Sequence, residues 1–190
     1  MVRIKSGSEA VLVGHARQGD REAFGTLVNQ YAPMVRRLTR AVLRDPDDAD
    51  DAAQNAFLAA WTGLSRFDAT QPFAPWLARI AVNAARDLRR RTRVRSTEEI
   101  PSDLPSGVRG PEAAAHAAVL RERLDQAMAS LTERQRAAVV LYEVEGYSHA
   151  EVAQVLGVPE GTARSDLFHA KRRLRPLLEP DMKGGPDDTP

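Results

Sequence analysis

Residues 148–178, with the sequence SHAEVAQVLGVPEGTARSDLFHAKRRLRPLL, predict two helices joined by a tight turn. Ser148 can cap the first helix, and Glu151 three residues later completes a capping box. Gly157 supplies the left-handed residue that ends this helix, and Pro159 suits the first turn of the next. The stretch is therefore typical of a helix-turn-helix, whose second helix enters the major groove of duplex DNA.

The second of these helices has two unlike sides. Its apolar side recurs at helical spacing and predicts a buried stripe of Ala163, Leu167, Ala170, Leu174 and Leu177. Its other side carries Gly161, Ser165, Phe168 and Arg172, flanked by Arg164, Lys171 and Arg175. A basic side turned outward is what a recognition helix needs. An ordinary helical hairpin with a solvated basic side would show the same pattern, and this stretch alone leaves that alternative open.

The composition predicts an all-α protein. Helix formers such as Ala, Leu, Arg and Glu dominate the 190 residues, a length that suits one large or two small domains. The chain has no cysteine, which excludes disulfides and thiolate metal sites and suits the cytosol. No apolar run approaches membrane-spanning length, and the N-terminus lacks a signal-peptide core. We therefore expect a cytoplasmic protein without direct membrane insertion.

After a short helix expected from Ser8 to Arg17, two longer helices are expected before the first long loop. The pattern from Asp20 to Val42 predicts the first, with a kink or junction at Pro33. After a turn at Asp45-Pro46 a second helix follows, with a buried side rich in alanine. Its other side carries Asp48, Asp51, Gln54, Asn55, Leu58 and Thr62. A leucine among these polar groups can mark a partner surface, although single exposed leucines are normal.

The next helix, expected from about Pro75 to Arg93, carries a basic stripe. Its members, at spacings of four, three and four, are Arg79, Asn83, Arg86 and Arg90. Trp76 borders the stripe, and cations beside an aromatic ring suit the phosphates and unstacked bases of a single strand. A solvated helix face with Trp76 in the core would give the same pattern.

Proline and glycine interrupt all periodicity at residues 96–111, which predicts a flexible linker. We expect one domain at residues 8–95 and a second at residues 112–178, which contains the helix-turn-helix. The tail at residues 179–190 has the composition of a disordered segment.

The order of these parts resembles an extracytoplasmic-function (ECF) sigma factor of the sigma-70 family, the small kind that has only regions 2 and 4. The resemblance is carried by the blocks DREAFGTLVNQYAPMVRRL, DDADDAAQNAFLAAW, PFAPWLARIAVNAARDLRRR and LTERQRAAVVLYEVEGYSHAEVAQVLGVPEGTARSDLFHAKRRLR. It implies a subunit that directs bacterial RNA polymerase core to promoter DNA and melts the −10 element. Region 2 would be residues 8–95, region 4 residues 112–178, and an anti-sigma factor is a further candidate partner. We expect no cofactor, metal or catalytic residue.

The resemblance also implies three sets of site residues. Core polymerase would bind Asp48, Asp51, Gln54, Asn55 and Leu58. The −10 strand would bind the loop from Phe67 to Phe73, with Phe67, Phe73, Trp76, Arg79, Asn83, Arg86 and Arg90 as its contacts. The −35 duplex would bind Arg164, Ser165, Phe168, Lys171 and Arg172.

Two residues depart from the family's pattern. Asn55 stands where a glutamate is usual, which removes a charge from the core-binding surface. Asp166 stands where a basic or polar residue is usual. An aspartate can accept from the cytosine amino group, but Asp166 lies at the flank of the recognition helix. We expect a local salt bridge with Arg173, or no role.

Two other functions compete with this interpretation. A helix-turn-helix regulator that binds duplex DNA without polymerase would have a similar C-terminal half, but it would not need the basic stripe. An enzyme is the least favoured, because the sequence has no phosphate loop or nucleophile motif. The histidines at 15, 116, 149 and 169 also lack a metal-ligand spacing.

Overall fold

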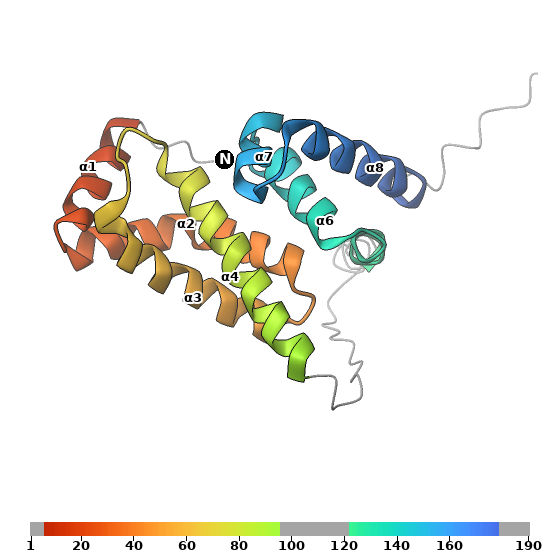
Figure 1. The fold of residues 1–190 in the computed structure, drawn as a ribbon, viewed down its shortest axis with the longest axis horizontal. Helices are drawn as coiled ribbons and strands as arrows, with labels where there is room; N and C mark the ends of the chain where they lie inside the picture. Colours follow the sequence, from red (N-terminus) through yellow and green to blue (C-terminus); the bar gives the residue numbers. More distant parts are fainter. Residues whose placement is uncertain (1–5, 96–121, 179–190) are drawn as a thin grey trace, which may run out of the picture.

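The computed structural model describes residues 6–95 and 122–178, and every regular element in these ranges is helical (Figure 1). The N-terminal group consists of α1 (Ser6–Arg17), α2 (Arg21–Val42), α3 (Pro46–Gly63), the 3₁₀ turn η1 (Leu64–Arg66) and α4 (Phe73–Arg95). The C-terminal group consists of helical residues 122–129, α6 (Glu133–Val139), the π-helix η2 (Val140–Val144), α7 (His149–Leu156) and α8 (Glu160–Leu178). The all-α prediction is confirmed. The predicted linker at 96–111 and tail at 179–190 lie outside the described residues.

Aspartate caps set the beginnings of α2 and α3. Asp20 Oδ1 accepts from the backbone N–H groups of Glu22 and Ala23 at 2.9 and 3.1 Å. Asp45 caps α3 in the same way, and Pro46 occupies the first turn, where its missing N–H costs nothing. The turn expected at Asp45-Pro46 is therefore the start of a helix as well.

Helix α2 continues through Pro33 as one helix. The sequence had suggested a kink or a junction at Pro33, and the structure has no junction there. Pro33 is exposed, whereas Leu27, Val35 and Leu38 on the inner side are buried. Proline removes one backbone hydrogen bond from the helix, and burial of this apolar side offsets that loss.

The core of the N-terminal group lies between α2, α3 and α4. Helix α3 turns a row of alanines inward, namely Ala49, Ala52, Ala53, Ala56 and Ala60. Because these side chains are small, α3 can lie close to α2 and α4, with which it packs most extensively. At the end of α3 the rings of Phe67, Phe73 and Trp76 pack together, with centroids 4.7–5.8 Å apart.

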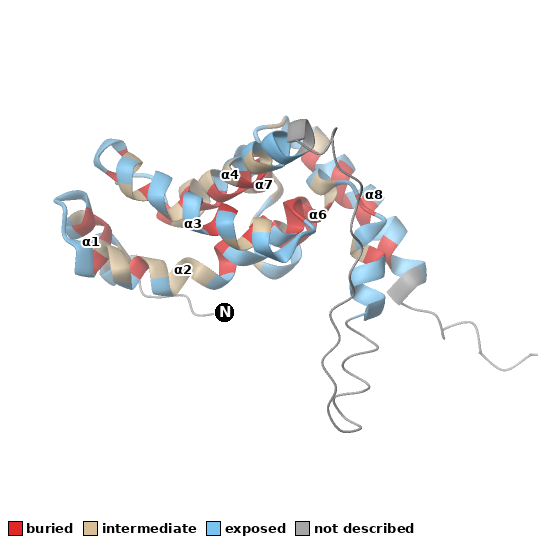
Figure 2. Cartoon of the chain, turned by 90° about the horizontal axis from the view of Figure 1, so that it is seen from below, coloured by how far each residue is buried: buried red, intermediate tan, exposed pale blue. Residues whose placement is uncertain are grey.

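The C-terminal group packs directly against α2 and α4, through α6 and α7 (Figures 1 and 2). Arg136 of α6 is only 8% exposed. It donates hydrogen bonds to the backbone carbonyls of Ala41 at 2.6 Å and Leu131 at 2.7 Å. Since Ala41 belongs to α2, one buried guanidinium joins the two groups.

Among residues 6–95 and 122–178, no helix is both long enough and apolar enough to span a bilayer.

Candidate nucleic-acid interface

The helix-turn-helix is formed by α7 and α8, and its turn has the predicted local structure. Ser148 Oγ accepts from Glu151 N at 3.3 Å, while Glu151 Oε2 accepts from Ser148 N at 2.8 Å. Gly157 ends α7 at φ 68°, a left-handed conformation that a residue with a side chain adopts at a cost. The capping box and the glycine stop are both confirmed.

The outward side of α8 is basic and carries an exposed phenylalanine. Ala163, Leu167, Ala170 and Leu174 are buried, as their spacing predicted. We call the exposed set Arg164, Ser165, Phe168, Lys171 and Arg172 the α8 surface. Phe168 is 62% exposed, so this surface presents an apolar ring to solvent.

Most charges of the α8 surface have partners within the C-terminal group. Arg164 pairs with Glu160 one turn earlier, at 2.6 Å. Lys171 pairs with Glu143 at 2.6 Å, and this hydrogen bond raises the pKa of the lysine above its ordinary value. Arg172 has no ion pair or hydrogen bond to the described residues, and it lies beside Arg173 in a shallow hollow. Exposed pairs of this kind are weak, so they leave the surface available to phosphates.

Asp166 does not pair with Arg173, so that expectation is wrong. Its carboxylate is buried and accepts from Arg134 of α6, at 2.5 Å from Nε and 3.2 Å from Nη2. Arg173 instead donates to the Ser130 carbonyl at 2.8 Å. Asp166 therefore joins α8 to α6, which the spacing within one helix could not indicate.

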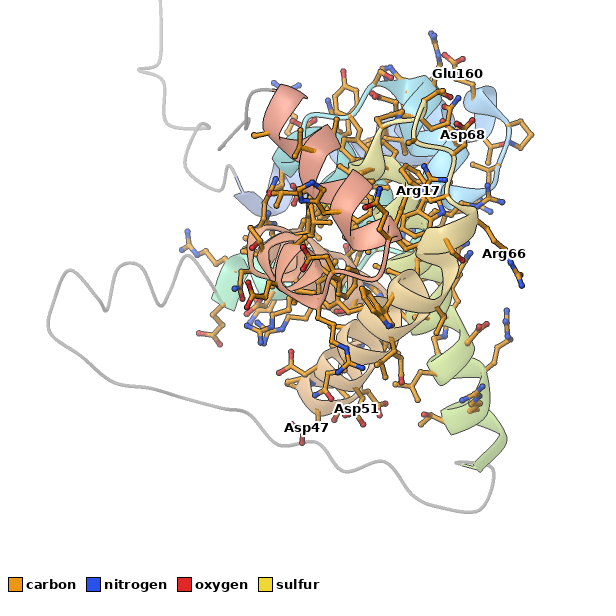
Figure 3. All side chains as sticks on the ribbon, turned by 90° about the vertical axis from the view of Figure 1, so that its left-hand side faces the viewer. Arg17, Asp47, Asp51, Arg66, Asp68 and Glu160 are labelled. Atoms are coloured by element: carbon orange, nitrogen blue, oxygen red, sulfur yellow. The ribbon has the colours of Figure 1, made fainter. Side chains whose placement is uncertain are left out.

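A second exposed surface lies on α3. Its members Asp48, Asp51, Gln54, Asn55 and Leu58, the α3 surface, all lie outside the core, and Leu58 is 65% exposed. Figure 3 shows Asp47 and Asp51 projecting from this helix. Partial burial, and then the nearby Asp45, Asp51 and Asp47, raise the pKa of the Asp48 carboxyl above its ordinary value. The surface thus combines an unpartnered leucine with concentrated negative charge.

The basic residues of the predicted α4 stripe differ in exposure. Arg79, Asn83 and Arg90 are exposed, and Arg90 forms an ion pair with Asp87. The Arg86 side chain is only 22% exposed. It donates to the Leu156 carbonyl at the end of α7, at 3.1 Å.

The resemblance implies that Phe67 and Phe73 contact the −10 strand, but their rings are buried in this structure. They are 5% and 2% exposed and belong to the aromatic cluster beneath the loop. Trp76 is half-buried against the same rings. One part of its side chain therefore belongs to the core, and the other part is exposed. The clustered rings support the loop rather than presenting stacking faces.

Four charged residues contribute to these surfaces or their supports but were not among the predicted site residues. Glu133, Arg134 and Arg136 meet α2, α4 or α8 across long sequence separations, so no local spacing could indicate their contacts. Arg66 could have been noticed as a basic residue beside an expected loop. It is exposed and points away from the protein in Figure 3.

Comparison with known sequences identifies both halves of this arrangement. The family model described as Sigma-70 region 2 matches residues 27–95, and the one described as Sigma-70, region 4 matches residues 121–174. The fold and its surfaces therefore define a sigma-70 type protein.

Whole-chain relatives narrow this class. The chain is 38% identical to the ECF RNA polymerase sigma factor SigM of Mycobacterium tuberculosis, with 90% of this chain and 85% of the relative covered. It is 34% identical to the RNA polymerase sigma factor NccH of Alcaligenes xylosoxydans xylosoxydans, with 90% and 95% covered. This chain belongs to the ECF RNA polymerase sigma factors.

Solved structures agree on the fold. CnrH in complex with the cytosolic domain of CnrY is 29% identical, with a TM-score of 0.67 and 92% of this chain and 99% of that chain covered. The sigma factor RpoE of Bartonella quintana, in complex with the anti-sigma factor NepR, has a TM-score of 0.70 at 23% identity, with 83% and 98% covered.

Proposed function

We propose that this sigma factor binds promoter DNA through two separate surfaces, the α8 surface for the −35 duplex and the α4 stripe for the melted −10 strand. The observation that carries the proposal is the α4 stripe itself, a basic row on a helix that is not part of the helix-turn-helix. A regulator that only binds duplex DNA has no use for such a row.

The α8 surface suits a duplex because it lies on the second helix of the motif. Arg164, Lys171 and Arg172 supply cations for phosphates or for guanine edges, and Ser165 can hydrogen-bond to either. Phe168 can contact a thymine methyl group, which would cover its exposed ring.

The α4 stripe suits a single strand. Arg79 and Arg90 supply charge for phosphates, and Asn83 between them offers both a donor and an acceptor to an unpaired base. Trp76 contributes the half of its ring that stays outside the core. Arg66 extends the positive charge toward the loop. Phe67 and Phe73 act indirectly, by holding that loop.

The α3 surface is proposed to bind RNA polymerase core. Leu58 would be its apolar centre and Asp48, Asp51 and Gln54 its polar rim, the arrangement common to protein interfaces. Asn55 makes the rim less acidic than the family's usual glutamate would. The division into region 2 at residues 8–95 and region 4 at residues 112–178 belongs to the same proposal, as do a cytoplasmic location and the lack of a catalytic reaction.

An anti-sigma factor is a further proposed partner, as the family resemblance implies. The similar protein CnrH was solved in complex with the cytosolic domain of CnrY. The charged α3 surface is the place where such a protein could compete with polymerase.

Run-off transcription tests the proposal. Purified bacterial core polymerase should produce a transcript from promoter fragments of the source genome only when this chain is added. Arg172→Ala and a combined Arg79→Ala, Asn83→Ala variant should each reduce that transcript, the first by weakening closed-complex formation and the second by impairing opening. Full transcript from the combined variant would contradict the role of the α4 stripe. Duplex binding without any core-dependent transcript would favour the regulator instead.

A further inference from the structure

The C-terminal group covers part of the α4 stripe. Arg86 donates to the Leu156 carbonyl at the C-terminal end of α7, which is the negative end of that helix. Glu133, at the start of α6, places Oε1 3.7 Å from Arg86 Nε and forms an ion pair with Arg89 as well. Both side chains of the Arg86–Glu133 pair are less than one quarter exposed.

Glu133 is the counter-charge of a crowded set of arginines. Burial, followed by the nearby charges of Arg134, Arg90 and Arg89, lowers the pKa of the Arg86 guanidinium from its ordinary value. Among the described residues, Glu133 is the acidic side chain that forms ion pairs with Arg86 and Arg89. Without its charge, the arginines would repel one another across the junction.

A second set of contacts holds the same two groups together away from the stripe. Arg37 of α2 pairs with Glu145, just after η2, at 2.7 Å. Arg44 donates to the Ala129 carbonyl at 2.6 Å. These contacts do not involve α4, so they can be broken separately from the Glu133 contacts.

We propose that the C-terminal group acts as an internal competitor of the −10 strand, with the Glu133 carboxylate and the Leu156 carbonyl occupying Arg86 and Arg89 in place of strand phosphates. The inference rests on the proposed function of the α4 stripe. A carboxylate and a carbonyl at a helix C-terminus offer oxygen acceptors to a guanidinium as a phosphate does. The strand and the C-terminal group therefore exclude each other at Arg86, and strand binding requires the two groups to separate.

The test measures binding of a fluorescent single-stranded 20-nucleotide oligonucleotide of mixed sequence to the full chain, by anisotropy at about 50 mM salt, where charge contacts are strong. Glu133→Gln should tighten binding by at least about fivefold, within the usual range of coupling between sites. Glu145→Gln should also tighten it, but less, because it loosens the junction without freeing Arg86. The matched control is Glu122→Gln, which removes the same charge from an exposed residue that has no ion pair within the described part of the chain.

A double-mutant cycle assigns the gain to the masked arginines. In an Arg86→Ala, Arg89→Ala background, Glu133→Gln should no longer tighten binding, because the residues that it releases are gone. Small-angle X-ray scattering on a Glu133→Gln, Glu145→Gln double variant should give a larger radius of gyration than the wild type. Circular dichroism checks that each variant keeps its helices.

Several results would overturn the inference. An unchanged affinity for Glu133→Gln would do so, as would an equal gain for Glu122→Gln or a gain that persists without Arg86 and Arg89. A double variant that binds more tightly but stays as compact as the wild type would show that charge alone was removed. A different result would show that the proposed function itself is wrong. In that case Arg79→Ala and Arg90→Ala would leave strand binding unchanged, with either Glu or Gln at position 133.

Discussion

The α8 surface and the α4 stripe follow the same sequence pattern, a basic row opposite an apolar side, but they differ in what lies over them. The charges of the α8 surface pair with residues of their own group or point to solvent, as Arg164 and Arg172 do. Arg86 of the α4 stripe is partly covered by a group that is distant in sequence. The pattern on a helix therefore identifies a candidate surface, while its availability depends on contacts made by the rest of the chain.

The strongest change in stability is expected at Arg136, whose buried guanidinium joins the two groups. Arg136→Ala removes a buried guanidinium from the carbonyls of Ala41 and Leu131 and leaves both acceptors without that donor. We expect the free energy of unfolding to fall by about 3 kcal/mol, since hydrogen bonds to charged groups contribute about 1.5–3 kcal/mol each. Urea denaturation measures this change. Arg172→Ala on the open surface is the control and should change stability by less than about 0.5 kcal/mol.

If both variants were equally stable, Arg136 would contribute nothing to the junction. The covered and open surfaces would then not differ in how firmly the rest of the chain holds them.

The next prediction concerns the α3 surface and its binding to core polymerase. Leu58→Asp should abolish co-purification with core polymerase while leaving the helical content unchanged, because Leu58 is exposed at the centre of the α3 surface. Truncation of a central interface residue costs about 2 kcal/mol or more, and an added charge increases that cost. Thr62→Asp, further along the exposed side of α3, is the matched control. Wild-type recovery of the Leu58→Asp variant with core would remove α3 from the polymerase interface.

A smaller effect tests the open surface directly. Arg172→Ala should weaken binding to a duplex −35 fragment by about 1–3 kcal/mol if Arg172 makes a bidentate base contact. Its gel-shift affinity for a single-stranded oligonucleotide should not change. Equal losses on the duplex and on the single strand would mean that α8 contributes only general charge, and the contrast between the two surfaces would disappear.

The smallest effect tests the other surface. Asn83→Ala should leave the −35 duplex affinity unchanged but reduce opening of the −10 region, by about 1 kcal/mol for one lost base contact. Permanganate footprinting measures opening on a paired promoter and on one that is already mismatched at −10. The defect should persist on the mismatched template if Asn83 recognises a base rather than driving melting. Normal opening on both templates would exclude Asn83 from the interface.

The sequence predicted what local interactions determine. The capping box at Ser148, the stop at Gly157 and the alanine side of α3 each depend on residues within about one or two helical turns, and the structure has all of them. The structure has a second capping box at Thr132 and Gln135, and it is equally local. Family resemblance then supplied the order of the helices.

The contacts that the sequence could not predict are those between distant segments. Asp166 could not be assigned to Arg134 rather than Arg173, because both partners are sterically possible until α6 and α8 are placed. The resemblance implied strand contacts for Phe67 and Phe73, but hydrophobic burial places both rings in the core. The cover over Arg86 depends on how the two groups meet, which no periodicity records.

The alanine side of α3 has a consequence for how a partner recognises the opposite side. Side chains that end at Cβ bring no rotamer freedom to the contact, so the helix backbone is held directly against α2 and α4. The outward residues Asp51, Gln54 and Leu58 therefore start from a fixed backbone, and a partner has little backbone motion to arrest when it binds. Changes in these outward residues should consequently alter the lifetime of a complex more than its rate of formation.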